Sequence, residues 1–472
     1  MARIETDLLV IGAGSGGLSV AAGAVQMGAS VVLLEGGEMG GDCLNYGCVP
    51  SKSLIAAAKA AHGQAYAAPF GIANVTPQID YAAAMGHVHD VIAQIAPHDS
   101  QERFERLGVR VIRAWGRFVN EREVEAGDTR IRARRIVIAT GSSPFVPPIP
   151  GLDTVPYLTN ETLWTLRERP GHLIVVGGGP IGMEMAQAHR RLGSEVTVLE
   201  GARALGRDDP EAAALVLERL RAEGVRTEEG TRVAEVRGAE GAIEVLDEDG
   251  RSFTGTHLLL AVGRKANTDA LNLAAAGIET TRTGVKVDSR LRTTNRRVYA
   301  IGDAAGGMQF THLAGYHAGI VIRQALFGLP ATARIDHIPR ATYTDPELAQ
   351  VGPTEAEARK AHGPKLEVAR FDYSGNDRAL AERKPEGFVK VMVVKGRPVG
   401  ATIVGHQAGE QIALWALAVA NGLKMQALAN MVAPYPTISE VSKRAAGAYF
   451  SPRLFDSALV RRVVGTVQRW LP

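Results

Sequence analysis

The sequence predicts an α/β protein with two Rossmann-like dinucleotide-binding units and a third, α+β region at the C-terminus. Three observations predict this fold class. A strand, a glycine-rich turn and a helix follow one another twice along the chain. Each turn is followed by a further strand that ends in a glutamate, and the last 130 or so residues lack such a turn. A length of 472 residues leaves room for about three domains.

The first unit begins close to the N-terminus. Residues 8–11 have the apolar character of a buried strand, residues 12–17 read Gly-Ala-Gly-Ser-Gly-Gly, and an alanine-rich helix follows. The next strand ends in Glu35, 23 residues after Gly12, close to the separation of about 20 that places an acid on the ribose of a dinucleotide. The predicted cofactor-binding residues are Gly12, Gly14, Gly17 and Glu35.

The second unit repeats this pattern. Residues 173–176 read as a strand, residues 177–182 read Gly-Gly-Gly-Pro-Ile-Gly, and the strand at 195–199 ends in Glu200, again 23 residues after the first glycine. One glycine turn of this kind is weak support, but two turns framed by strand, helix and acid are strong support. The chain should therefore hold two dinucleotides, the second at Gly177, Gly179, Gly182 and Glu200.

Further strands run into short motifs, and composition changes divide the chain. The motifs are Thr140-Gly141, Gly263 and Gly302-Asp303. A proline-rich stretch at 144–150 and a change of composition near Pro339 indicate boundaries. The predicted segments are 1–149, 150–266, 267–338, which returns to the first unit, and 339–472.

Composition excludes several classes of protein. With 46% hydrophobic and 22% charged residues, the chain is neither disordered nor collagenous. A net charge of +3 without a dense basic stripe argues against a nucleic-acid partner. No export signal is visible, and the apolar run at 412–420 is far shorter than the roughly 20 residues that a membrane-spanning helix requires. We therefore expect a soluble, cytoplasmic protein.

The chain has only two cysteines, Cys43 and Cys48, which excludes a disulfide scaffold and an all-cysteine zinc site. On a regular helix, residues five apart are too distant for a disulfide, so we expect a distorted backbone, which Asn45 and Gly47 permit. A helix predicted over 51–61 would aim its positive end at Cys48 and favour a thiolate there. Two buried hydrophobic cysteines are the alternative.

Together these motifs resemble the flavin-dependent pyridine nucleotide:disulfide oxidoreductases, the family of dihydrolipoamide dehydrogenase, glutathione reductase and mercuric reductase. The resemblance covers essentially the whole chain, with the motifs in the family's order. It implies FAD at the first turn, NAD(P)H at the second, and a homodimer formed by the last segment. It also implies that Asp303 binds the ribityl or diphosphate part of the flavin, and it adds as cofactor-binding residues Gly41, Thr140, Gly141, Gly263 and Gly302.

The resemblance also implies a mechanism. Hydride passes from nicotinamide to the flavin, and the reduced flavin opens a Cys43–Cys48 disulfide. Cys48 would be the thiolate against the flavin, and Cys43 the more exposed sulfur that attacks substrate. Lys52 and Glu184 would form an ion pair near the flavin N5, with two separate surface charges as the alternative.

Glu200 bears on the choice of nicotinamide cofactor. A carboxylate at this position would accept a hydrogen bond from a ribose 2′-hydroxyl and repel a 2′-phosphate, which favours NADH. Arg203 and Arg207 lie close enough in sequence to reach a phosphate, so NADPH stays the alternative.

The C-terminal region departs from the family pattern. Dihydrolipoamide dehydrogenase and glutathione reductase carry a His-Pro pair followed by Glu, and the partner subunit's histidine exchanges protons with the substrate thiol. Here Tyr435 takes that position, followed by Glu440. A phenol with a pKa near 10 is a poor base beside an imidazole near 6.5, so proton transfer from a dithiol should be impaired. Both residues are candidate catalytic residues, with packing at the subunit interface as the alternative for Tyr435.

The substrate is open at this point. We predict a thiol or disulfide substrate. Mercuric or other soft-metal reduction is one alternative, because Tyr435 and the helix residues 186–188 resemble mercuric reductase and a soft metal suits a thiolate pair. The absence of a C-terminal cysteine pair weakens it. A redox-sensing flavoprotein with a membrane or protein partner is the other alternative, and the direction of electron flow is equally open.

Histidines and the C-terminal tail complete the candidates. His87 and His89 have suggestive spacing but read as a solvated helix face, so no metal site is predicted. His312 and His317 are better functional candidates, with ordinary helix packing as the alternative.

In the C-terminal tail, residues 459–467 have apolar residues at helical spacing with arginines opposite. Docking onto the dimer is the favoured role of this tail, and an interfacial membrane contact is the alternative.

Overall fold

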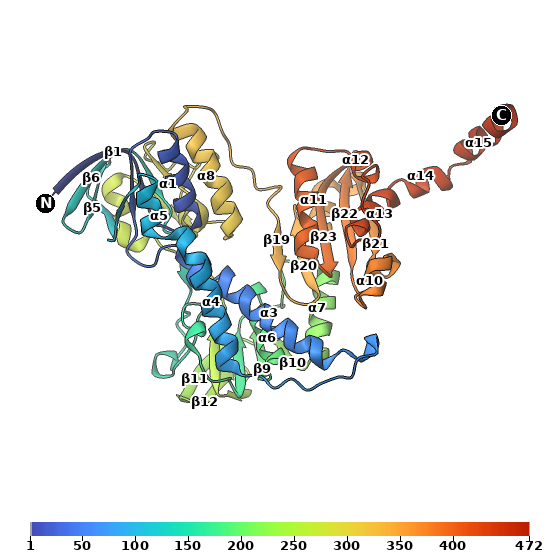
Figure 1. The fold of residues 1–472 in the computed structure, drawn as a ribbon, viewed down its shortest axis with the longest axis horizontal. Coiled ribbons are helices and arrows are strands. Elements are labelled where there is room, and N and C mark those ends of the chain that lie inside the picture. The colour runs from blue at the N-terminus through green and yellow to red at the C-terminus, as the bar shows by residue number, and fades with distance from the viewer. Residues whose placement is uncertain (1, 472) are drawn as a thin grey trace. The chain divides into compact units, whose positions relative to one another are not determined.

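The computed structural model describes residues 2–471, and its internal contacts divide the chain into two compact units (Figure 1). The first unit contains residues up to 67 together with 73–201 and 230–334. The second contains 68–72, 202–229 and the residues from 335 onward. The four segments predicted from the sequence stay a prediction.

The main sheet of the first unit is mostly parallel. Five of its strands are parallel: β1 (Ala2–Ile11), β2 (Val31–Leu34), β3 (Arg110–Ile112), β6 (Thr129–Ile138) and β18 (Val298–Ala300). β4 (Gly116–Phe118) and β5 (Glu123–Ala126) extend it in antiparallel fashion. Leu8 and Val10 pack toward the helices α1 (Ser15–Gln26) and α8 (Thr311–Ala325), whereas Leu9 and Ile11 pack toward the opposite face. Both faces are covered where residues 8–11 and 136–138 lie, which is why these parts of β1 and β6 are continuously apolar.

A second parallel sheet surrounds the second glycine turn. It contains β8 (His172–Val176), β9 (Glu195–Glu200) and β14 (His257–Leu260), with α6 (Pro180–Arg191) connecting β8 to β9. The antiparallel strands β11 (Val233–Ala239), β12 (Ala242–Asp247) and β13 (Ser252–Gly255) pack their apolar side chains into the same core. Two parallel sheets of this kind confirm the predicted α/β class.

The helix that follows the cysteines packs between parts of the first unit. α3 (Cys48–Ala65) contacts both α4 (Tyr81–Asp99) and α6. The sequence placed its start at Ser51, which is wrong by three residues. Pro50 lies in the first turn, where an amide N–H has no partner inside the helix, so the proline does not prevent a start at Cys48.

The second unit is built on a five-stranded antiparallel sheet. Its strands, in spatial order, are β19 (Arg340–Thr342), β20 (Glu347–Val351), β23 (Arg397–Gly405), β22 (Phe388–Val394) and β21 (Leu366–Asp372). α11 (Ala408–Ala420), α12 (Met425–Ala429) and α13 (Glu440–Ala448) pack on it around the buried Trp415. Antiparallel strands need no strand–turn–helix crossover of the kind that carries a phosphate-binding turn. The sheet therefore agrees with the lack of such a turn in this part of the sequence.

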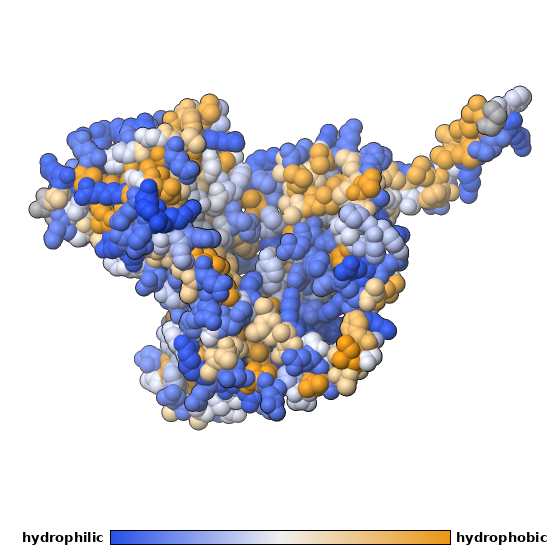
Figure 2. Space-filling view, in the orientation of Figure 1, coloured by the Kyte–Doolittle hydropathy of each residue, from blue (hydrophilic) through white to orange (hydrophobic). Residues whose placement is uncertain are grey.

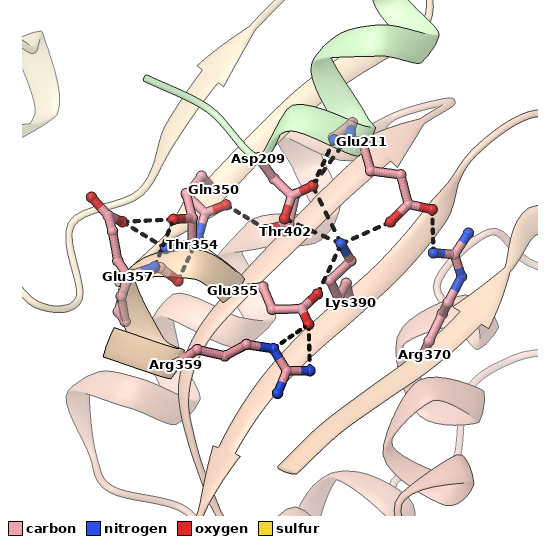
Figure 3. A network of polar contacts seen from close by, with 12 residues as sticks. Asp209, Glu211, Gln350, Thr354, Glu355, Glu357, Arg359, Arg370, Lys390 and Thr402 are labelled. Carbon is pink, nitrogen blue, oxygen red and sulfur yellow. Dashed lines mark hydrogen bonds and ion pairs between the residues drawn. The ribbon is translucent and has the colours of Figure 1, made fainter. Parts of the chain in front are cut away.

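A buried lysine ties the segment 202–229 to this sheet (Figure 3). Lys390 Nζ, on β22, lies 3.2 Å from Asp209, 2.8 Å from Glu211 and 3.1 Å from Glu355. Asp209 caps α7 (Pro210–Ala222), and Glu355 begins α9 (Glu355–His362). Burial opposes the charge of Lys390, but the hydrogen bonds to Glu211 and Glu355 outweigh it and raise the pKa of the lysine.

The chain ends in two short helices, α14 (Ser451–Phe455) and α15 (Ala458–Trp470), neither of which contains a buried residue. Among residues 2–471, no helix is long and apolar enough to cross a membrane.

The remaining helices and strands are α2 (Gly41–Asn45), α5 (Gln101–Arg106), α10 (Asp377–Ala381), β7 (Ser142–Pro144), β10 (Val225–Glu229), β15 (Arg264–Ala266), β16 (Thr280–Thr281) and β17 (Gly284–Val285).

Candidate functional site

The two cysteines lie on either side of a break between helices. Cys43 belongs to α2, and Cys48 is the first residue of α3. At Gly47, a Cβ would lie 3.1 Å from Asp42 O and 3.4 Å from Cys43 Cα, a tight approach that favours glycine. The expected distortion is therefore centred on Gly47. The part given to Asn45 was wrong, because Asn45 stays helical and its amide donates to the carbonyls of Met39 and Gly41.

Both cysteines are free in the structure. The hydrogen bond between their sulfurs lowers the pKa of Cys48 to about 6 and raises the pKa of Cys43 well above its usual range. The Thr311 hydroxyl, 3.4 Å from Cys48 Sγ, and the charge of Lys52 also lower the pKa of Cys48. These contacts favour the thiolate at Cys48 and the proton at Cys43.

In the chain alone, Cys48 is exposed and Cys43 is partly exposed. The order implied by the resemblance, with Cys43 as the more exposed sulfur, refers to the pair with Cys48 against the flavin and stays a prediction.

An ion pair joins the helix after the cysteines to the helix after the second glycine turn. Lys52 Nζ on α3 lies 2.7 Å from Glu184 Oε2 on α6. The Glu184 side chain is 6% exposed, and a carboxylate that is this buried requires a partner charge. Lys52 also lies one helical turn after Cys48, so the same ammonium group acts on both the carboxylate and the thiolate.

The first glycine turn, residues 12–17, leaves room for a diphosphate. A Cβ at Gly12 would lie 2.4 Å from Ala139 O, and one at Gly17 would lie 1.9 Å from Gly12 O, so both positions require glycine. No described atom lies within 4 Å of a Cβ built at Gly14, where α1 begins with neither a side-chain cap nor an acidic first turn. A helix N-terminus with open space in front of it fits a diphosphate such as that of FAD. Glu35 Oε2 accepts the Ala13 N–H at 2.6 Å.

The second glycine turn, residues 177–182, has nearly the same geometry. A Cβ at Gly177 would lie 2.4 Å from Ala261 O, and one at Gly182 would lie 2.0 Å from Gly177 O. Gly179 again has no described atom within 4 Å of its Cβ position. Glu200 Oε2 accepts the Gly178 N–H at 2.7 Å. The turn therefore offers a second site for a dinucleotide diphosphate.

A polar cluster links the cysteine segment to the Gly302-Asp303 motif. Arg264 Nη2 lies 2.9 Å from Asp42 Oδ1, next to Cys43, and Arg264 Nε donates to Ser142 at 2.7 Å. The Ser142 hydroxyl in turn donates to Asp303 Oδ2 at 2.6 Å. Burial raises the pKa of Asp303, although Ser142 and Arg264 oppose the rise. Four segments distant in sequence, at residues 42, 142, 264 and 303, are thus linked.

Four residues that contact the predicted ones or one another were not predicted from the sequence: Asp42, Ser142, Arg264 and Thr311. A signal was present for two of them, because Asp42 directly precedes Cys43 and Arg264 directly follows Gly263. Nothing local indicated Thr311, which is 263 residues from Cys48 in the sequence.

The remaining predicted glycines mark bends beside this cluster. Gly141, Gly263 and Gly302 all have positive φ, which favours glycine. The Thr140 hydroxyl donates to Asn267 O at 2.7 Å and so ties β6 to the chain beyond β15. A Cβ at Gly41 would lie 2.8 Å from Gly14 Cα, which brings the cysteine segment directly against the first glycine turn.

Tyr435 and Glu440 lie in the second unit. The Tyr435 side chain is 69% exposed and its hydroxyl donates to Asp377 Oδ2 at 2.9 Å. This hydrogen bond favours the neutral phenol and raises the pKa of Tyr435, so even less of the phenolate, the form that can accept a proton, is present at neutral pH than for an ordinary tyrosine. Glu440 is the first residue of α13.

The histidines have structural partners. His317 is buried, its Nδ1 accepts the Gly302 N–H at 3.2 Å, and burial lowers its pKa to about 4. His317 thus supports the Gly302-Asp303 motif as a neutral ring. His312 stacks on Phe310, and His89 Nε2 lies 3.0 Å from Trp164 O. Within residues 2–471, no group of three or more His, Cys, Asp or Glu side chains has the arrangement of a metal site.

Comparison with known proteins gives two family matches. Residues 6–318 match the family model described as pyridine nucleotide-disulphide oxidoreductase, and residues 338–446 match the dimerisation domain of the same family. The chain is 35% identical to a mercuric reductase of Streptomyces lividans, over 94% of this chain and 96% of that protein. It is 33% identical to a dihydrolipoyl dehydrogenase of Bacillus subtilis, over 92% and 96%.

Solved structures agree with this assignment. LpdA of Mycobacterium tuberculosis superimposes with a TM-score of 0.87 at 27% identity, over 95% of this chain and all of that one. The copper complex of the HOCl-induced flavoprotein disulfide reductase RclA of Escherichia coli gives a TM-score of 0.84 at 28% identity, over 93% and 99%. The chain therefore belongs to the pyridine nucleotide-disulphide oxidoreductase family, whose members are FAD-dependent enzymes that use NAD(P)H.

Proposed function

We propose that the chain is an NADH-dependent disulfide reductase that acts as a homodimer in the cytoplasm, with Cys43 and Cys48 as its redox pair. One observation carries this proposal. The pKa of Cys48 is lowered to about 6 and that of Cys43 is raised, so the two thiols are unequal and share one proton. A pair of this kind can exchange electrons with a disulfide without help from an outside base.

The chain's own residues would act as follows. The shared proton moves from Cys43 to Cys48, and the Cys43 thiolate attacks one sulfur of the substrate disulfide. That S–S bond breaks, a mixed disulfide forms on Cys43, and the first substrate thiol leaves with a proton from water. Cys48, after giving its proton to the second departing sulfur, attacks Cys43 and closes the Cys43–Cys48 disulfide. The two electrons of the pair have then reduced one disulfide to two thiols.

FAD, when bound, supplies the two-electron carrier between the nicotinamide and this disulfide. Lys52 and Glu184 would orient one another beside the pair, and Glu440 would lie with Tyr435 at the substrate side. The residues that would hold FAD are Gly12, Gly14, Gly17, Glu35, Gly41, Thr140, Gly141, Gly263, Gly302 and Asp303. Those that would hold NADH are Gly177, Gly179, Gly182 and Glu200.

The choice of NADH, the dimer and the compartment have separate support. Glu200 ends β9, where a carboxylate selects a ribose hydroxyl over a phosphate. Residues 338–446 match the family's dimerisation domain, which supports a homodimer. NADH and reduced thiol pairs both belong to the cytoplasm, which supports that compartment.

A soft metal ion is the second candidate substrate, and Tyr435 is the observation that favours it. A metal ion displaces thiol protons as it binds, so it needs no histidine base. Two relatives of similar identity are named for mercury and for dihydrolipoamide, respectively.

The proposal is tested by anaerobic NADH oxidation with lipoamide as the disulfide and, separately, with mercuric ion in excess thiol. We expect wild-type enzyme to reduce lipoamide and both Cys43→Ser and Cys48→Ser to lose at least about 1000-fold in kcat/KM. Full activity of Cys48→Ser would overturn the proposal, and turnover with mercuric ion alone would replace it by the second candidate. Tyr435→His should raise kcat/KM for both dihydrolipoamide and lipoamide, because the imidazole that takes a proton from the dithiol returns it to the departing sulfur in the reverse direction.

A further inference from the structure

The C-terminal helix α15 has the chemistry of a surface-bound amphipathic helix. Leu459, Val463, Val467 and Trp470 recur at helical spacing and form one apolar face. The opposite face carries three arginines, Arg461, Arg462 and Arg469, and residues 457–471 contain neither Asp nor Glu. Figure 2 shows this separation, with the hydrophobic colour along one side of the tail and the hydrophilic colour along the other.

This apolar face is uncovered in the described chain. The exposed fractions of Leu459, Val463 and Trp470 are 71%, 53% and 81%. A helix of 13 residues that is rich in valine and contains a glycine is at best marginally stable in water without a surface to cover it. The sequence nevertheless favours a helix here, because the Ser457 hydroxyl caps the helix start by accepting the Val460 N–H.

The segment before α15 contacts the second unit. Arg453 on α14 forms an ion pair with Glu367 of β21 and stacks over the Tyr449 ring at 3.9 Å. Leu454 and Phe455 on the same short helix are 50% and 71% exposed, so they add apolar surface next to α15. Beyond these contacts, the tail therefore carries an exposed helix with one apolar face and one cationic face.

We propose that α15 binds the surface of a membrane that contains anionic lipids, with its apolar face in the acyl boundary and its arginines at the headgroups. Charge favours this occupant, because an uninterrupted cationic face complements anionic headgroups. The aromatic end at Trp470 suits the boundary between water and lipid. The match to the family's dimerisation domain ends at residue 446, before α14, so α15 is not part of the matched domain.

The experiment is flotation of the FAD-loaded, full-length enzyme with vesicles of phosphatidylcholine alone or with about 30% phosphatidylglycerol, at low and high salt. We expect binding to the anionic vesicles only, reduced by salt. Replacing all three tail arginines by Gln should lower the partition coefficient by about 100-fold, at roughly fivefold per arginine. The same change at Arg106, Arg110 and Arg117, which are exposed in the first unit, is the matched control and should have little effect.

A second pair of variants separates apolar insertion from charge. Val463→Glu places a carboxylate on the apolar face and should abolish binding, whereas Gln468→Glu adds the same charge on the polar face and should retain most of it. The proposal is overturned when wild-type enzyme stays unbound on anionic vesicles, or when both variants lose binding equally. It is also overturned when Val463→Glu converts the dimer to monomer in sedimentation without changing vesicle binding, because the helix then docks on a second copy of the chain.

Discussion

The two glycine turns differ in their surroundings rather than in their own geometry. Gly12 and Gly177 have φ of 107° and 111°, and a Cβ at either would lie 2.4 Å from a carbonyl oxygen of a neighbouring strand end. The first turn is closed on one side by the cysteine segment, since Gly40 pairs with Gly14 and the Gly40 N–H donates to Ala13 O. Within the second turn, by contrast, the Ile181 side chain is 43% exposed.

This difference indicates how one motif serves two roles. A dinucleotide held at the first turn would be covered by the segment that carries Cys43 and Cys48, which suits a cofactor that remains bound. A dinucleotide at the second turn would meet an open rim, which suits a substrate that exchanges in every cycle. The contacts outside the motif therefore decide between retention and exchange.

The sharpest test replaces the equivalent glycine in each turn. Gly12→Ala and Gly177→Ala meet the same positive φ and the same 2.4 Å contact, so each should lower the free energy of unfolding by about 2 kcal/mol or more. Gly12→Ala should yield protein with little bound FAD. Gly177→Ala should keep its FAD and show a KM for NADH raised by roughly 100-fold. Flavin absorbance per chain and steady-state kinetics measure both, and equal loss of FAD in the two variants would break the comparison.

Gly41→Ala tests the wall of the first turn alone. Its Cβ would lie 2.8 Å from Gly14 Cα at a φ of 62°, so the cysteine segment has to shift away. We expect FAD to dissociate roughly tenfold faster or more, as measured by dilution and filtration. Gly63→Ala in α3 is the control, because no described atom lies within 4 Å of its Cβ position. Unchanged FAD release in Gly41→Ala would show that the wall has no role in retention.

The two glutamates that follow the turns, Glu35 and Glu200, provide a further test of this comparison. Glu200→Gln removes the charge that opposes a 2′-phosphate, so the ratio of kcat/KM for NADPH to that for NADH should rise roughly tenfold, on the order of 1.4 kcal/mol. Glu35→Gln at the first turn should leave that ratio unchanged and weaken FAD retention instead. A wild-type enzyme that prefers NADPH would contradict the role given to Glu200.

The smallest expected effect concerns the ion pair that joins the two regions. Lys52→Met removes a positive charge that stabilises the Cys48 thiolate, so the pKa of Cys48 should rise from its value of about 6. The thiolate fraction at neutral pH then falls, and the pH profile of thiolate absorbance in the reduced enzyme should move to higher pH. Lys52→Arg keeps the charge and should restore the wild-type profile. A profile that does not move in Lys52→Met would show that the charge of Lys52 has no part in setting the pKa, which the hydrogen bonds from Cys43 and Thr311 would then determine.

Local requirements of the backbone made much of the site predictable. Gly12, Gly17, Gly177 and Gly182 are needed where a Cβ would strike a carbonyl oxygen, and such requirements fall at fixed spacings along the chain. The apolar strands on either side of each turn are buried on both faces, so they are visible as continuous runs. The sequence by itself therefore determined the two turns, the strands that frame them and the break at the cysteines.

Only the tertiary structure decided which distant groups meet. The contacts of Cys48 with Thr311, of Arg264 with Asp42, and of Lys390 with Asp209 join residues more than 150 positions apart. No spacing rule encodes them, because they depend on how helices and sheets pack rather than on local backbone geometry. Steric requirements of the local backbone can be predicted from the spacing of residues in the sequence. Contacts between residues distant in the sequence form only when the chain has folded, so they could not be predicted in this way.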